Sequence, residues 1–135
     1  MKKIQGKSIE VNSTSAAVYN YLSDFNNFEH LMPEQISDWE STEEQCSFSI
    51  TGMGKVGLKI SEKQINKRIT YVPEGSIPFH FNLQANIIET SQGKCTIDYL
   101  INADLNPMLS MMASGPLKNL VDIMADKTGE ILNNK

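Results

Sequence analysis

The clearest pattern in the chain is an alternation of apolar and polar side chains between residues 79 and 105. Apolar residues occupy every second position from Phe79 to Ile87, and Ser91-Gln92-Gly93 then turns the chain. The same alternation runs from Cys95 to Leu105. Alternation over this length is typical of antiparallel strands that bury one face and expose the other to water.

Weaker alternation predicts five further strands. Four lie in the first half of the sheet-forming region, where the turn signal Pro73-Glu74-Gly75 closes the last of them, and one lies at the N-terminus. Together with the two long strands they predict a curved, seven-stranded antiparallel sheet. The five segments are residues 3–11, 36–43 (around Trp39), 46–50, 56–60 and 69–71.

Two short helices are predicted between the N-terminal strand and the rest of the sheet. Ser13 or Thr14 can cap a helix over residues 14–22, because a hydroxyl at this position accepts from the free N–H groups of the first turn. A second short helix over residues 25–31 carries apolar residues at every third position and ends at Pro33.

The C-terminal segment predicts one long helix that begins at Pro107 and continues to Leu132. Such a helix is about 39 Å long, given the α-helical rise per residue. The pair Gly115-Pro116 lies inside it and is expected to divide it, since proline and glycine both disfavour helix interiors. We therefore expect a methionine-rich segment over residues 107–113 that moves as a lid, and a longer segment from Pro116 that stays anchored.

The order of elements and two stretches of sequence resemble the START-like (SRPBCC) superfamily. The stretches are VNSTSAAVYNYLSDFNNFEHLMP (residues 11–33) and ADLNPMLSMMASGPLKNLVDIMADK (residues 103–127). The superfamily includes relatives of the birch-pollen allergen, lipid-transfer domains, and polyketide cyclases and dehydrases. The resemblance covers nearly the whole chain and implies a single α+β domain over residues 1–135. It further implies a helix-grip fold, in which the sheet wraps the long helix around an apolar cavity.

The resemblance, together with the apolar faces of the predicted strands and helices, gives the residues expected to line such a cavity. Methionines are soft and adaptable, so those of the last helix either fill an irregular core or form a wall that adjusts to its guest. The Tyr99 hydroxyl is a candidate for orienting that guest. The expected ligand-binding residues are Phe28, Leu31, Met32, Phe48, Leu58, Phe79, Phe81, Leu83, Tyr99, Ile101, Met108, Leu109 and Met112.

Candidate groups for acid–base chemistry are few. Tyr99, His30 and Glu62 are the side chains that an enzyme of the cyclase or dehydratase kind would need to aim into the cavity. Glu62 points inward if the strand before it stays regular and outward if a bulge intervenes, and Ile65 favours the bulge. Neither histidine has the spacing of a metal site or a catalytic triad, so no metal and no cofactor are expected.

The remaining motifs favour ordinary structural roles. The run Gly52-Met53-Gly54-Lys55-Val56-Gly57 matches GxGxxG, but strands on both sides of it predict a hairpin instead of a nucleotide site. Cys46 and Cys95 are expected to be buried, reduced thiols. Lys59, Lys63 and Lys67 recur every four residues and are expected to share one solvated face.

Composition and charge narrow the function classes. The 135 residues carry a formal net charge of −4, which gives no bulk electrostatic support for binding nucleic acid. No stretch approaches the roughly 20 apolar residues of a membrane span, and the N-terminus lacks the apolar run of a signal peptide, so we expect a cytoplasmic protein without stable membrane insertion. A monomer or a weak homodimer is expected.

The favoured hypothesis is a non-catalytic protein that binds or carries a hydrophobic small molecule, such as a lipid, a quinone or a polyketide-like compound. The first alternative is an enzyme of the cyclase or dehydratase kind acting on a polyketide-like substrate. The second is a protein-interaction module, which predicts an exposed apolar patch around Trp39.

Overall fold

The computed structural model describes residues 2–50, 54–75 and 79–133. The helical elements are α1 (Ser15–Leu22), α2 (Phe25–Phe28), the short 3₁₀ helix η1 (Glu29–Leu31) and α3 (Pro107–Asn133). The strands are β1 (Lys2–Gln5), β2 (Ile9–Val11), β3 (Ile36–Ser41), β4 (Gln45–Ile50), β5 (Gly54–Gln64), β6 (Arg68–Glu74), β7 (Phe81–Ser91) and β8 (Lys94–Ala103).

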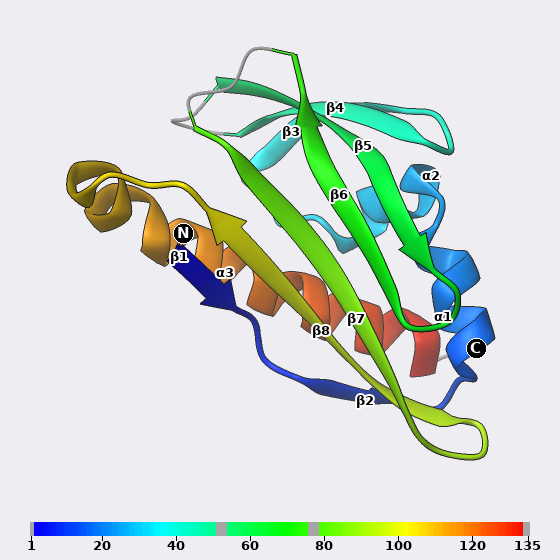
Figure 1. Cartoon of the computed structure of the whole chain (residues 1–135). Helices are drawn as coiled ribbons and strands as arrows, with labels where there is room; N and C mark the ends of the chain where they lie inside the picture. Colours follow the sequence, from blue (N-terminus) through cyan, green and yellow to red (C-terminus); the bar gives the residue numbers. More distant parts are fainter. Residues whose placement is uncertain (1, 51–53, 76–78, 134–135) are drawn as a thin grey trace.

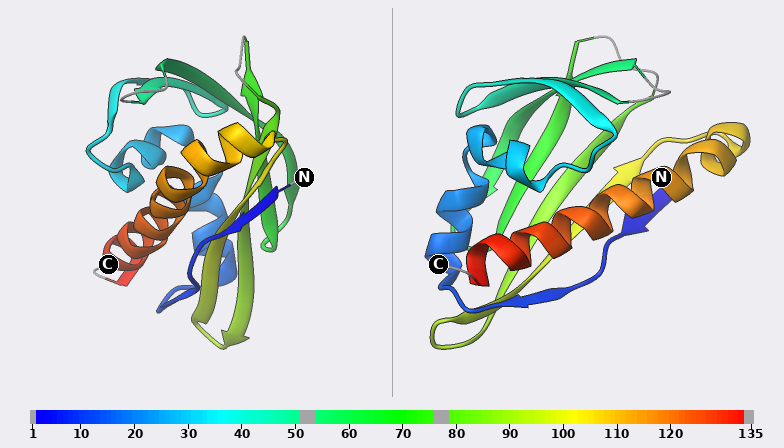
Figure 2. Two further views of the ribbon diagram at one scale, coloured as in Figure 1. Left: turned by 90° about the vertical axis from the view of Figure 1, so that its left-hand side faces the viewer. Right: turned by 180° about the vertical axis from the view of Figure 1, so that it is seen from behind.

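The strands of the described residues form one antiparallel sheet in the order β1-β8-β7-β6-β5-β4-β3, with β2 also paired to β8. The sheet is strongly curved, and α1, α2 and α3 all lie on its concave side (Figures 1 and 2). We call this concave side the inner face. The α+β helix-grip architecture predicted from the sequence is therefore confirmed.

The N-terminal strand differs from its prediction because Gly6 interrupts it. The predicted strand over residues 3–11 is present as β1 and β2, both of which pair with β8. A Cβ at Gly6 would lie 2.9 Å from the Tyr99 carbonyl oxygen and 3.0 Å from the Val121 Cβ. The interruption therefore lets α3 approach the sheet more closely than a continuous strand with side chains would allow.

Polar side chains of α3 take up backbone groups that the interrupted strand leaves unpaired. The Lys7 N–H donates to Asp122 Oδ1 at 2.8 Å, and Lys118 Nζ donates to the Gln5 carbonyl at 2.8 Å. Burial alone would raise the pKa of Asp122, but the hydrogen bonds from Lys7 and Lys118 hold it below its ordinary value. Lys7 Nζ also pairs with Asp126 Oδ2 at 2.7 Å, so polar side chains of α3 dock against residues 5–7.

The long C-terminal helix is continuous, which corrects the expectation that Gly115-Pro116 divides it. Pro116 lies inside α3. Ala113 and Leu117 are both buried, so α3 packs against the core on either side of the proline. This packing offsets the cost of an interior proline, and no break is present to support a lid formed by residues 107–113.

A bulge in β5 turns Glu62 outward, as the sequence favoured. The register between β5 and β6 shifts between Ile60 and Glu62, and Glu62 then pairs with Thr70. Glu62 is exposed, and Gln64 Nε2 donates to Glu62 Oε1 at 3.1 Å. The same shift separates the lysines: Lys59 pairs with Val72, whereas Lys63 pairs with the buried Ile69, so the three lysines do not share one face.

The core lies between the inner face and the helices and contains a compact aromatic cluster. The ring centroids of Phe25 and Phe28 are 5.1 Å apart, and that of Phe28 lies 4.9 Å from the centroid of Tyr71. Both cysteines are buried and unbridged, as expected, and burial raises the pKa of the Cys46 thiol to about 12. Among the described residues, no helix has the length and apolar character needed to cross a membrane.

Two buried tyrosine hydroxyls tie the helices to the sheet. Tyr71 on β6 donates to the Leu22 carbonyl at the end of α1, at 2.6 Å. Tyr99 on β8 lies 2.7 Å from Thr128 Oγ1 on α3, and Thr128 in turn donates to the Met124 carbonyl at 2.6 Å. Because the single hydroxyl proton of Thr128 is used by that carbonyl, Tyr99 is the donor to Thr128.

Glycine substitutions test how closely α3 approaches β1 and β2. We expect Gly6→Ala to destabilise the protein by about 1–3 kcal/mol, because the added methyl group overlaps Tyr99 and Val121. Gly115→Ala on α3 is the matched control, since no atom lies within 4 Å of its added Cβ. It should stabilise the helix by about 1 kcal/mol. Urea unfolding measures both, and equal effects of the two substitutions would contradict the close approach.

A double-mutant cycle tests the link between Tyr99 and Thr128. We expect Thr128→Val to cost about 1–3 kcal/mol, because it leaves the buried Tyr99 hydroxyl without an acceptor. Tyr99→Phe should cost less, since Thr128 keeps its hydrogen bond to the Met124 carbonyl. The double variant should be more stable than the sum of the single losses predicts. Strictly additive unfolding free energies would show that the two hydroxyls are not coupled.

Candidate ligand-binding interior

The structure brings eleven of the thirteen predicted ligand-binding residues to the interior or its edge. Phe28, Leu31 and Tyr99 are fully buried, and five others from β4, β5, β7, β8 and the segment before β7 are nearly so. These five are Phe48, Leu58, Phe79, Leu83 and Ile101. Met32, Phe81 and Leu109 are half-buried against the same core. The interior is thus lined by apolar side chains from both the sheet and the helices.

Half-buried apolar side chains gather at one end of the sheet, where β3, β5 and β7 begin and β4, β6 and β8 end. Ile36 and Ile50 are paired across β3 and β4. Phe81 begins β7 opposite Ala103, the last residue of β8, and Leu105 and Leu109 follow in the connection to α3 and its first turn. We call Ile36, Ile50, Phe81, Leu105 and Leu109 the apolar rim. It is continuous with the buried core and partly open to solvent.

The tyrosine hydroxyls of the interior are already committed to structural hydrogen bonds. Burial raises the pKa of both Tyr71 and Tyr99 well above the ordinary tyrosine value, so both stay protonated. Each donates its proton to a helix, Tyr71 to the Leu22 carbonyl and Tyr99 to Thr128. The Tyr99 hydroxyl expected to orient a guest therefore has no free proton for that role.

The other two candidates for acid–base chemistry lie outside the interior. His30 is exposed in η1, and Glu62 is exposed on the outer face after the bulge in β5. No group of three or more metal-binding side chains is clustered among residues 2–50, 54–75 and 79–133. None of the three side chains predicted for acid–base work thus presents a free proton donor or a free base to the interior.

Trp39 is a partly buried residue at the edge of the core that was not among the predicted ligand-binding residues. The protein-interaction alternative predicts an exposed apolar patch around Trp39, whereas its ring packs against the core and stacks on Phe48 with centroids 5.3 Å apart and planes 12° apart. The register between β3 and β4 shifts between Ser37 and Glu40, and Asp38 adopts a positive φ of 55°. A signal was present in the sequence, because the alternation in residues 36–43 is weak and breaks near Trp39.

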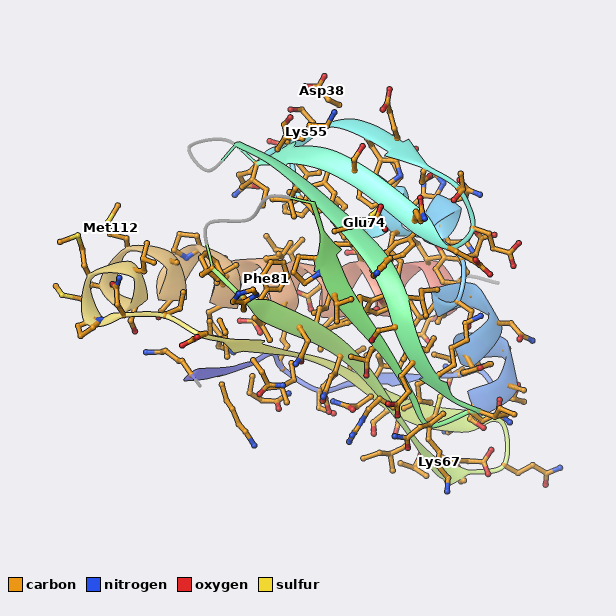
Figure 3. All side chains as sticks on the ribbon, turned by 45° about the horizontal axis from the view of Figure 1, so that its top comes forward. Asp38, Lys55, Lys67, Glu74, Phe81 and Met112 are labelled. Atoms are coloured by element: carbon orange, nitrogen blue, oxygen red, sulfur yellow. The ribbon has the colours of Figure 1, made fainter. Side chains whose placement is uncertain are left out.

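The predicted ligand-binding residues Met108 and Met112 lie outside the interior. Their exposed fractions are 71% and 68%, and that of the neighbouring Met111 is 88%. The first buried residue of α3 is Ala113, so the turns before it project beyond the sheet. Figure 3 shows Met112 on this projecting end. We call Met108, Met111 and Met112 the methionine patch.

Two open hollows occur on the outer face, away from all of these residues. One, of about 650 Å³, follows a row of paired residues across β3, β4, β5 and β6, namely Glu40, Ser47, Gly57 and Glu74. The other, of about 760 Å³, lies around Arg68, Asn86 and neighbouring residues. Of the glycine-rich run, Gly52 and Met53 lie outside the described residues, and Gly54 begins β5.

Known proteins share this fold at low sequence identity. No protein-family model and no curated sequence matches the chain. Truncated norcoclaurine synthase from Thalictrum flavum matches with a TM-score of 0.74 at 13% identity, over 99% of this chain and 94% of that one. A START superfamily protein from Mycobacterium smegmatis gives 0.69 at 14% identity, over 98% and 97%. The Aha1 dimer from Colwellia psychrerythraea gives 0.67 at 16% identity, over 98% and 97%. The chain therefore has the START-like helix-grip fold.

Proposed function

We propose that this protein binds a hydrophobic small molecule between the inner face of the sheet and α3, without transforming it. The observation that carries the proposal is the apolar rim, where half-buried side chains of two strand pairs and one helix lead from solvent into an apolar core. Apolar side chains that are open to solvent and pack on the core are typical of the edges of ligand-binding grooves. The likeness to START-like proteins supports the same location.

The position of α3 makes this interior suitable for a guest. Its main contacts are with β8, β2, β1 and η1, whereas α1 contacts β7 and β6. The long helix therefore does not lie over β3, β4 and β5, and partly buried side chains such as Ile36 and Ile50 lie at the edge of the core there. The flexible side chain of Met32, which is partly buried against this core, can change rotamer at low cost to admit a guest.

The free energy gained by burying an apolar guest is sufficient for micromolar affinity. A guest that buries about ten methylene groups gains roughly 8 kcal/mol before the costs of binding are subtracted. Affinity in the micromolar range then needs no charged contact. Catalysis is not part of the proposal, because Tyr99, His30 and Glu62 offer no free acid or base to the interior.

Paired substitutions on β7 test the proposed site. Phe81→Asn replaces a rim side chain by a polar one and should weaken binding of a medium-chain ketone about tenfold, because apolar contact is lost. Ile88→Asn is the matched control on the same strand, since Ile88 is 59% exposed and lies far from the rim in the sequence of β7. Native mass spectrometry of both variants and the parent protein measures the bound fraction. Equal affinities in all three proteins would contradict the site.

Self-association through the methionine patch is a second candidate function. Residues 105–117 contain no charged side chain, and three methionines in this stretch are largely exposed. Methionine adapts to irregular partner surfaces, and two copies of one patch can meet around a two-fold axis. The similar Aha1 protein is described as a dimer.

Sedimentation velocity tests this second candidate. Replacing Met108, Met111 and Met112 together by glutamine keeps good helix formers and should abolish any concentration-dependent increase in sedimentation coefficient. Ile65→Gln is the control, because Ile65 is 74% exposed on the hairpin between β5 and β6. A parent protein that stays monomeric at high micromolar concentration would rule out self-association.

A further inference from the structure

A bulge in the edge strand β3 directs Trp39 to the inner face. Asp38 and Trp39 together lie opposite Phe48, because Ser37 pairs with Ser49 and Glu40 pairs with Ser47. In a regular strand Trp39 would share the outer phase of Ser37. Asp38 instead takes a positive φ of 55°, a strained conformation for a residue with a Cβ. Bulges of this kind re-aim a side chain, and such strain is concentrated at functional sites.

The indole N–H that this bulge brings inward has no partner. Trp39 Nε1 is the one buried side-chain nitrogen or oxygen without a hydrogen bond among residues 2–50, 54–75 and 79–133. The buried hydroxyls of Tyr71 and Tyr99, by contrast, are both hydrogen-bonded. A buried donor left unpaired in a native structure calls for an explanation. A missing ligand atom is a physical explanation that fits this location.

We propose that Trp39 Nε1 selects a guest that carries a carbonyl oxygen, such as a ketone, an ester or a quinone. This inference rests on the proposed binding of a hydrophobic guest in the interior. The indole N–H donates to the carbonyl oxygen, and the apolar part of the guest lies along Phe48 and the apolar rim. Trp39 is then a specificity-determining residue, and its ring keeps its stack on Phe48.

The surroundings of Trp39 favour a neutral acceptor over other polar groups. Trp39 stacks on Phe48, and the paired Ile36 and Ile50 occupy the next inner positions along β3 and β4. An anionic headgroup would lose its hydration there with a single N–H donor in return, which is unfavourable. A hydroxyl group would bring a donor of its own that needs a further acceptor. A carbonyl oxygen needs only the donor that Trp39 offers.

A matched pair of probes isolates this hydrogen bond. 2-Undecanone and 2-methylundec-1-ene have nearly the same shape and differ in whether an oxygen or a methylene group is doubly bonded to the chain. The parent protein should bind the ketone about tenfold more tightly than the alkene, because only the ketone pairs with the buried N–H. Trp39→Phe, which keeps an aromatic ring against Phe48 and removes the donor, should lose this preference and bind the alkene at least as tightly as the ketone, because the carbonyl then loses its hydration without a donor in return.

Two measurements report the binding of the probes and the hydrogen bond to Trp39. Native mass spectrometry gives the affinity of each probe for the parent, Trp39→Phe and, as a control for lost ring contact, Phe48→Leu. The Phe48→Leu variant should weaken both probes alike and keep the preference for the ketone. Because Trp39 is the only tryptophan, its indole N–H gives a single resonance in a ¹⁵N-labelled sample. That resonance should move downfield with the ketone and not with the alkene, in the parent protein without any substitution.

The outcomes separate the two proposals. Equal binding of ketone and alkene by the parent protein, with no downfield movement of the indole resonance, overturns the role of Trp39 and leaves the hydrophobic site intact. Failure of both probes to bind overturns the site and the role together. A ketone preference that persists in Trp39→Phe also overturns the inference, because another donor is then responsible.

Discussion

The inner face of the sheet must be covered, and the rest of the structure depends on how this is done. Strands β7 and β8 carry an apolar side chain at every second position, so one face of their hairpin cannot stay in water. The helices cover it, and two tyrosine hydroxyls fix them in place. Tyr71 ties α1 to β6, and Tyr99 ties α3 to β8 through Thr128. The helices are held by directional bonds as well as by apolar contact.

The two halves of the inner face differ in how closely the helices and side chains cover them. Near β8 the contact is close, since Gly6 lets Val121 approach and α3 binds the backbone of residues 5–7 through Lys118 and Asp122. Near β3 and β4 partly buried side chains lie at the edge of the core, and there a strained bulge turns Trp39 inward with an unpaired N–H. The half near β8, where polar groups are paired, gives stability. The half near β3 and β4, where a polar group is unpaired, is where a guest is proposed to bind.

Local sequence signals predicted the parts of the fold that local chemistry controls. The alternation in residues 79–105 predicted the long hairpin. Ile65, an apolar residue out of phase with the strand before it, indicated the bulge that turns Glu62 outward. Predictions were wrong for features that depend on contacts between distant parts of the chain. Pro116 was expected to break α3, but burial on both sides of it keeps the helix continuous. Met108 and Met112 were expected in the interior, but the helix begins beyond the edge of the sheet.

The sequence by itself determined the class of fold, the order of its elements and the apolar character of its interior. These follow from the period of the apolar residues, which any chain must satisfy by burying one face. Only the tertiary structure decided which polar groups of the interior are free. The Tyr99 hydroxyl is used by Thr128 and the indole N–H of Trp39 is not, because hydrogen-bond partners come from elements far apart in the chain. Periodicity does not encode that pairing.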